Sequence, residues 1–239
     1  MKWLTYILIV FFITAPEYYG NAEKPRMPKK IKKEFYKNGV LKSEGLMVNN
    51  LKSGHWKFYD EKGAILTEGF YENDLLHGPW REYWHDGTVK TEAYFESDIK
   101  EGYWRFYYAN GQLEKEGTFA NNEKQSWWHE YTGNGLLVSL GEYEKGDKTG
   151  YWKLYHSNGI LKEEGHFEKN ERILWWKEYN EYGKLEAEGH YFDNLKNGFW
   201  IHYSVMGRKE SEGMYKNGVR IETWKFFDDK GDICKILEF

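Results

Sequence analysis

The chain has 239 residues, 40% hydrophobic and 19% aromatic, so it is too aromatic to be an intrinsically disordered protein. Its 34 basic and 38 acidic residues give a formal net charge of -4, and this mild acidity offers no electrostatic footprint for nucleic acid or anionic lipid. A single cysteine, Cys234, excludes an internal disulfide framework.

The N-terminal segment has the pattern of a signal peptide. Lys2 precedes an apolar run over residues 3–15, which is the length of a signal-peptide core and shorter than the roughly 20 residues of a membrane-spanning helix. We expect residues 1–22 to be a signal peptide, with an uncleaved N-terminal anchor as the alternative, and residues 23–34 to be a basic linker. The predicted location is therefore secreted or periplasmic, in the cell envelope. Membrane contact is expected only through the N-terminal segment, if it is uncleaved.

Tryptophan then recurs every 24 residues to the end of the chain, which indicates that one supersecondary unit is repeated. These residues are Trp56, Trp80, Trp104, Trp128, Trp152, Trp176, Trp200 and Trp224. Eight full units cover residues 54–239, and a partial unit precedes them with Lys32 and Met47 in place of aromatic residues. We therefore expect residues 35–239 to form one repeat domain, with the partial unit as a polar cap.

Each unit has the pattern of a β-hairpin. Counted from the Trp as position 0, aromatic residues stand at +3 and +15, glycines at +7 and +13, an aliphatic residue at +9 and a glutamate at +12 in most units. The glycine at +7 often follows Asn or Asp, which favours a two-residue hairpin turn. Because Tyr182, Met206 and Lys230 are poor candidates for positive φ, a three-residue turn with a glycine bulge remains the alternative. The predicted fold is all-β: an elongated, single-layer antiparallel sheet of consecutive hairpins.

A two-residue turn fixes which residues face each other across a unit. It places each Trp opposite the +13 glycine, so that the indole covers a bare glycine, and each +1 cation opposite the +12 glutamate. The predicted ion pairs are Lys57–Glu68, Arg81–Glu92, Arg105–Glu116, Lys153–Glu164 and Lys177–Glu188. In this register the Trp, the +9 aliphatic residue and the +15 aromatic share one face. The ion pairs and the +3 Tyr lie on the other face, which we call the ladder face.

The repeat pattern resembles a known family. It is clearest in one unit, as Gly150, Trp152, Tyr155, Gly159, Leu161, Glu164, Gly165 and Phe167. This pattern resembles the MORN-repeat variant, the group often labelled YwqK-like antitoxin, and the resemblance covers residues 35–239. It implies a sheet of consecutive hairpins and a binding or scaffold role without catalysis, and the label implies a partner toxin. The pattern breaks at position -2, where Ser126, Leu174 and Glu222 replace glycine, and we expect those units to join their predecessors differently.

No residue pattern indicates catalysis. The glutamates form a ladder, which is typical of cross-strand partners for Lys and Arg and not of a clustered acid and base. His166 and His190 are equivalent residues of adjacent units, about 9 to 10 Å apart, too far to share one zinc ion. We therefore predict no catalytic residue, no metal site and no cofactor.

A second set of aromatic residues precedes the repeat Trp in the middle units. We expect the repeat Trp side chains to bury one another, and this second set to project from the ladder face beside cations. The set is Tyr103, Trp127, Tyr151, Trp175 and Phe199, which we call the aromatic row, with Arg105, His129, Lys153 and Lys177 beside it. Aromatic and cationic side chains together are typical of protein-interface hot spots, so our hypothesis is that these residues bind a protein partner. The alternative is a carbohydrate-binding or structural protein of the cell envelope, because exposed rings also stack on sugars.

Overall fold

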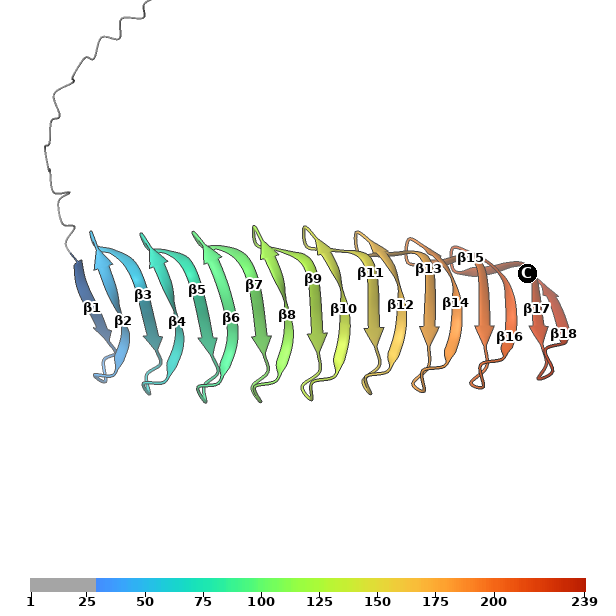
Figure 1. Ribbon diagram of the computed structural model, residues 1–239, viewed down its shortest axis with the longest axis horizontal. Helices are drawn as coiled ribbons and strands as arrows, with labels where there is room; N and C mark the ends of the chain where they lie inside the picture. Colours follow the sequence, from blue (N-terminus) through green and yellow to red (C-terminus); the bar gives the residue numbers. More distant parts are fainter. Residues whose placement is uncertain (1–28) are drawn as a thin grey trace, which may run out of the picture.

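The computed structural model describes residues 29–239, which form eighteen β-strands in one antiparallel sheet. Every strand pairs with the strand before it and the strand after it, so the sheet is a long meander whose strands lie side by side in chain order (Figure 1). This confirms the predicted all-β, single-layer fold. The strands are β1 (Lys29–Phe35), β2 (Leu41–Val48), β3 (Leu51–Tyr59), β4 (Ile65–Glu72), β5 (Leu75–Tyr83), β6 (Val89–Glu96), β7 (Ile99–Tyr107), β8 (Leu113–Ala120), β9 (Glu123–Tyr131), β10 (Leu137–Glu144), β11 (Asp147–Tyr155), β12 (Leu161–Glu168), β13 (Glu171–Tyr179), β14 (Leu185–Phe192), β15 (Leu195–Tyr203), β16 (Lys209–Lys216), β17 (Val219–Phe227) and β18 (Ile233–Glu238).

The first strand corrects the expected linker. The predicted signal peptide or anchor, and residues 23–28 of the linker, lie outside the described residues, but residues 29–34 form most of β1 and are not a linker. They pair with β2 in the register of the later units, with Lys32 opposite Gly45 and Lys33 opposite Glu44. The Nζ of Lys33 lies 3.1 Å from a carboxylate oxygen of Glu44. Lysines are well suited to this edge strand because their charge opposes pairing with further strands.

Turns within a unit have three residues and a glycine bulge, so the two-residue prediction is wrong and its alternative is right. In the first full unit the Asp60 N–H donates to the Ala64 carbonyl at 2.8 Å, and the Gly63 N–H donates to the Asp60 carbonyl at 3.0 Å. In this turn only the glycine has positive φ, +87° at Gly63. Lys62 and its equivalents Tyr182, Met206 and Lys230 therefore need no left-handed conformation.

A second irregularity restores the predicted register. Tyr59 lies opposite Ile65 and Phe58 lies opposite Thr67, so Leu66 is an extra residue that compensates for the longer turn. Trp56 consequently faces Gly69. The equivalent Trp–Gly pair recurs at Trp152, Trp176 and Trp200, and a cation–Glu pair lies beside the first two of these.

The same compensation moves the aliphatic residue at position +9 to the other face. Ile65 lies directly opposite Tyr59, whose hydroxyl donates to Glu44 on the ladder face. Directly opposite residues share a face, so Ile65 shares the ladder face with Tyr59, and the prediction that it joins Trp56 is wrong. The +15 aromatic is confirmed on the Trp face, because Tyr71 contacts Trp56 with ring centroids 6.4 Å apart.

Two-residue turns do occur, but between units. Val48 lies opposite Leu51, and both turn residues, Asn49 and Asn50, have positive φ, as a type I′ turn requires. The second turn residue also accepts a backbone bond from the preceding unit: the Lys52 N–H donates to Asp74 Oδ1 at 2.6 Å. The same bond recurs from Leu76 to Asp98, Lys100 to Asn122, Lys148 to Asn170 and Arg172 to Asn194. These turns therefore fasten each unit to the one before it.

The repeat Trp side chains form the core, and each except Trp104, which follows Ala93, covers the glycine of the preceding unit. A Cβ added to Gly45 would lie 2.2 Å from Cδ2 of Trp56, and one added to Gly165 would lie 2.3 Å from Cδ2 of Trp176. The prediction that the indole covers its own +13 glycine is therefore wrong, although that glycine is its partner in the strand register. The indole thus completes its neighbour's surface, and six of these Trp are less than 2% exposed.

Aromatic rings join these indoles into one file along the sheet. From Trp80 to Phe239 each repeat Trp alternates with a +15 ring, with centroids 5.0 to 6.4 Å apart and mostly edge to face. Edge-to-face aromatic pairs add about 0.5–1.5 kcal/mol each beyond their burial. The predicted mutual burial of the repeat Trp is confirmed.

Cations cover the outer side of this file. A Lys or Arg four residues before the Trp places its charge over the indole, as Lys196 does at 3.8 Å over Trp200 and Lys148 at 4.4 Å over Trp152. Trp80 has Leu76 at that position and is the repeat Trp that remains partly exposed. The side-chain stems and charges of these cations therefore help a single-layer sheet to hide its aromatic face.

We predict that Gly165→Ala destabilises the protein by about 1–3 kcal/mol, because the new methyl group overlaps the Trp176 indole. Gly133→Ala is the matched control, because a Cβ there meets nothing within 4 Å and its φ is not left-handed. Urea unfolding followed by Trp fluorescence measures both. Equal midpoints for the two variants would contradict the indole-over-glycine contact.

We also predict a pH-dependent loss of stability at His202. Burial, with Lys196 and Arg220 nearby, lowers the pKa of His202 from 6.5 to about 4, while Glu178 opposes the shift. The unfolded chain binds the proton more readily, so stability is full above pH 6.5 and falls as the pH drops toward 4, by about 1–3 kcal/mol allowing for partial exposure. His202→Phe, which introduces the side chain of the equivalent Phe226, should remove this dependence in urea titrations at pH 7.5 and 4.5. A wild-type midpoint that is unchanged between the two pH values would refute the assignment.

Candidate functional site

The aromatic row stands on a series of two-residue bulges. Between β8 and β9, Gly117 lies opposite Trp128 and Thr118 lies opposite Gln125, so Ser126 and Trp127 are skipped. The same skip occurs at every junction from one full unit to the next. On its other side the row is paired normally with the next strand of its own unit. Bulges of this kind re-aim side chains, and here they place one aromatic residue per unit on the ladder face.

The first residue of each bulge is left-handed whatever its identity. Gly150 has a φ of +66°, and Ser126, Leu174 and Glu222 have values of +63°, +60° and +59°. The expectation that these three units join their predecessors differently is therefore wrong. The conformation costs a residue with a Cβ about 1–2 kcal/mol, so the surrounding structure must enforce it.

The core enforces the bulge through the indole N–H. Trp128 Nε1 donates to the Thr118 carbonyl at 3.1 Å, and Trp152 Nε1 donates to the Glu142 carbonyl at 3.1 Å. These carbonyls lie ten residues earlier, in the preceding unit, beside the bulge. Trp56, Trp176, Trp200 and Trp224 make the equivalent bond. The buried indole therefore fixes the backbone from which four of the five row residues project, whereas Trp104, next to Tyr103, donates to the Glu101 carbonyl.

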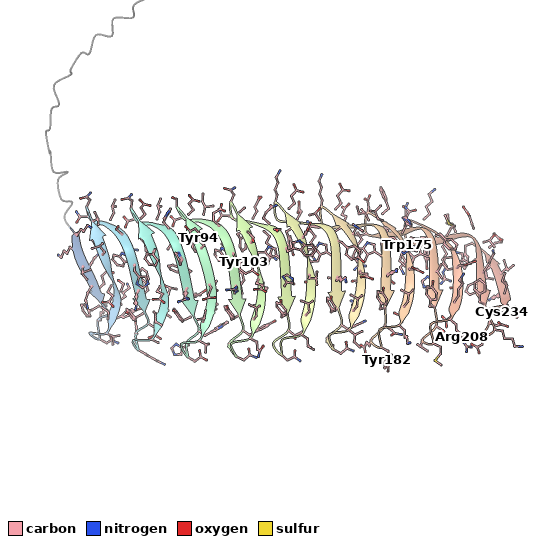
Figure 2. The ribbon with its side chains drawn as sticks, viewed as in Figure 1. Tyr94, Tyr103, Trp175, Tyr182, Arg208 and Cys234 are labelled. Atoms are coloured by element: carbon pink, nitrogen blue, oxygen red, sulfur yellow. The ribbon has the colours of Figure 1, made fainter. Side chains whose placement is uncertain are left out.

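All five members of the aromatic row are exposed, between 36% for Trp175 and 48% for Tyr103. Two are steadied by histidines across the hairpin: Tyr151 contacts His166, and Trp175 contacts His190, each with ring centroids 5.0 Å apart. Figure 2 shows Tyr103 and Trp175 in the half of the strands that lies near the turns between units. The exposure predicted for the row is thus present, on a fixed backbone.

The column of exposed rings extends further toward the N-terminus than the row. Phe70 and Tyr94 are 43% and 41% exposed and lie opposite His55 and Pro79, which occupy the row position in their units. Sequence reasoning missed them because they occupy position +14, the strand partner of the row position. The signal was available, since that position also carries His166 and His190.

The cations beside the row are held by carboxylates. Arg105 lies 3.3 Å from Glu116 and also over the Tyr103 ring at 5.2 Å. Of the five predicted ion pairs, four have the charged atoms within 4 Å. In the fifth pair Lys177 faces Glu188 in the register, but that carboxylate accepts from Trp175 Nε1 at 3.2 Å.

His129 departs from this pattern. It faces Leu140 in its own unit and Glu116 in the preceding one, and its ring stacks on Tyr131.

Tyrosines at position +3 form a further contact that the sequence reasoning missed. Except at Tyr155, where the preceding unit has Leu140, the hydroxyl donates to the glutamate of the preceding unit, for example Tyr179 to Glu164 at 2.8 Å and Tyr203 to Glu188 at 2.7 Å. Burial and these carboxylates raise the pKa of Tyr203 to about 12, so its hydroxyl remains a donor at neutral pH. In the aromatic row, burial and Glu164 raise the pKa of Tyr151 to about 12 in the same way.

In each unit the residue at the row position and its strand partner form a ridge of the column. Depressions lie between these ridges. One is lined by Tyr151, His166, Leu174, Trp175 and His190, with Glu164 and Lys177 at its side. Another spans three units and is lined by Phe70, Pro79, Trp80 and Tyr103. Both are open surface clefts. Across residues 29–239, no three His, Cys, Asp or Glu side chains are grouped as metal ligands would be.

A scan of family models matches five segments of the chain to the model described as MORN repeat variant: residues 30–49, 52–73, 76–97, 100–121 and 148–169. These five units are similar to MORN-variant repeats. The units of β9–β10 and β13–β18 lie outside the matched segments but continue the Trp spacing and the register of the MORN-variant units.

Comparison with solved structures gives weaker similarities. A TcdB2-TccC3 crystal structure without its hypervariable C-terminal region is 13% identical, with a TM-score of 0.24 over 82% of this chain and 13% of that chain. Virginiamycin B lyase from Staphylococcus aureus is 13% identical, with a TM-score of 0.17 over 89% of this chain and 75% of that chain. No curated protein matches the sequence. These similarities are too low to indicate a shared function.

The two adjacent Trp pairs separate the core from the candidate site. We predict that Trp128→Ala and Trp176→Ala each cost about 3–5 kcal/mol, because these indoles are buried. Trp127→Ala and Trp175→Ala should each cost less than about 2 kcal/mol, because these rings are exposed. Thermal and urea unfolding of the four variants tests this, and a comparable loss at Trp127 or Trp175 would show that the row is part of the core.

Proposed function

We propose that this chain is a non-catalytic repeat scaffold that binds a protein partner through the aromatic row and the cations beside it. The observation that supports the proposal most directly is the row itself, five exposed rings repeated once per unit, four of them on bulges that a buried Trp holds by a hydrogen bond. Clustered exposed apolar rings mark interaction surfaces, and Trp, Tyr and Arg are the residues that most often dominate binding energy.

We propose that the protein acts outside the cytoplasm, secreted or in the periplasm or cell envelope, because its N-terminal sequence has the pattern of a signal peptide. The narrower form of the proposal is an antitoxin or immunity role, in which the partner is a toxin that meets the scaffold in that compartment. The MORN-variant repeats support a scaffold. The narrower role rests on the resemblance to the YwqK-like group.

The test is capture of a stoichiometric partner by the immobilised protein from an envelope fraction of the source cells. Trp127→Ala/Trp175→Ala should abolish capture. Tyr182→Ala/Met206→Ala, which removes exposed apolar side chains from turn tips away from the row, should leave it unchanged. Capture that survives loss of the row would overturn the proposal, and retention on purified envelope glycan in place of protein would favour the carbohydrate-binding alternative.

A further inference from the structure

We propose that the aromatic row is a track for a basic, proline-containing linear segment of the partner, bound in the polyproline II conformation along the long axis of the sheet. The inference rests on the proposed function and names the chemistry of the partner. The spacing of the ridges and the negative charge of the turns between units beside them support this proposal.

The spacing of the ridges matches polyproline II. Successive row residues, such as Tyr151 and Trp175, lie two strands apart, which corresponds to about 9.6 Å at about 4.8 Å per strand. Polyproline II advances about 3.1 Å per residue with three residues per turn, so a side chain returns to the same face every 9.3 Å or so. Across the four intervals of the row the mismatch amounts to about 1 Å.

Other regular backbones fit this track less well. An α-helix returns to the same face after seven residues, about 10.5 Å, and its mismatch over four intervals reaches roughly 4 Å. An extended β-strand alternates faces, so a residue three positions on, about 10 Å away, points the wrong way. Polyproline II is therefore the backbone that presents one residue to every ridge.

The clefts between ridges suit proline rings. The cleft beside Leu174 is walled by the Tyr151–His166 pair on one side and the Trp175–His190 pair on the other. Aromatic-lined slots of this kind are how polyproline II ligands are held, because the ligand is already extended and loses little entropy on binding.

The turns between units, beside the column of exposed rings, are acidic. Glu144 and Glu168 lie two residues after Glu142 and His166, which are the strand partners of row residues, so their side chains share the ladder face. We define the acidic rim as Glu72, Glu96, Glu144, Asp147, Glu168 and Glu171. The turns between units at 72–75, 96–99, 120–123, 144–147 and 168–171 contain nine acidic residues and two basic residues, Lys145 and Lys169. This excess of negative charge is complementary to a basic ligand, and the cations Arg105 and Lys153 beside the row do not oppose it because they are already paired with Glu116 and Glu164.

Two acid pairs in the rim oppose each other directly. Glu144 lies opposite Asp147, and Glu168 lies opposite Glu171. Like charges opposite each other in a sheet are destabilising, and within residues 29–239 neither Glu144 nor Glu168 forms an ion pair. A Lys or Arg from a ligand relieves this repulsion. One basic residue per turn of polyproline II would meet the rim once per unit.

The test uses fluorescein-labelled peptides and the full chain, with binding followed by fluorescence anisotropy. The probe is about five repeats of Pro-Pro-Lys, roughly 46 Å long in polyproline II. It should bind at least tenfold more tightly than equally long repeats of Pro-Pro-Glu or of Gly-Ser-Lys. A peptide with two repeats should bind more weakly than one with five, because it meets fewer ridges.

Variants assign the contacts. Trp127→Ala/Trp175→Ala and Glu144→Gln/Glu168→Gln should each weaken binding of the Pro-Pro-Lys peptide at least tenfold. Glu61→Gln/Glu181→Gln, at turns on the opposite edge, should leave it unchanged. Equal binding of the Gly-Ser-Lys peptide overturns the polyproline II geometry, and equal binding of the Pro-Pro-Glu peptide overturns the charge argument.

The outcomes also separate this inference from the proposed function. If no peptide binds but partner capture still depends on Trp127 and Trp175, the linear-segment inference fails alone. If neither the peptide nor a partner depends on these rings, the proposed function fails with it. Preferential binding of envelope oligosaccharides over all peptides overturns the inference as well.

Discussion

The structure depends on one contact, an indole lying on a bare glycine of the preceding unit. A Cβ on that glycine would lie within 2.5 Å of the indole at Gly45, Gly117 and Gly189, so the indole packs in this position only over a residue that has no side chain. Ala93 replaces the glycine in the unit before Trp104, and the Trp104 indole N–H donates instead to the Glu101 carbonyl. Because every unit supplies the floor for the next indole, stability passes from neighbour to neighbour along the sheet, as expected for a repeat array.

This contact also connects the two faces of the sheet. The indole N–H reaches a carbonyl in the preceding strand, next to the point where the indole's own strand carries two residues that the preceding strand does not pair. The second of these two residues is a member of the aromatic row. The ring on the ladder face and the indole on the core face are therefore neighbours in sequence, as Trp127 and Trp128 are, with opposite roles. A left-handed Leu174 shows that the junction imposes the bulge even where glycine is missing.

The register and the exposure of the row could be predicted because both follow from a strict side-chain period. Trp56 faces Gly69 as predicted, yet for a partly different reason, since an extra residue at Leu66 compensates for a three-residue turn. An Asp-Gly or Asn-Gly pair is compatible with either turn, so local sequence could not decide between them. The aliphatic residue beside the bulge was assigned to the wrong face for that reason. The cation four residues before most of the repeat Trp residues recurs with the same period. It was missed because the sequence alone does not show that this cation lies over the indole ring.

A single-layer sheet has no second layer to cover either face, and this constraint decides where a partner can dock. One face is closed by its own aromatic file and by cations such as Lys148 and Lys196 above it. On the other face Arg105 and Lys153 are matched by carboxylates, and the tyrosine hydroxyls by the same carboxylates. The aromatic row is what this internal pairing leaves uncovered over the middle units. A partner gains apolar contact there without breaking any bond that holds the sheet together, which is why we place the interaction surface on the row and not on the Trp file.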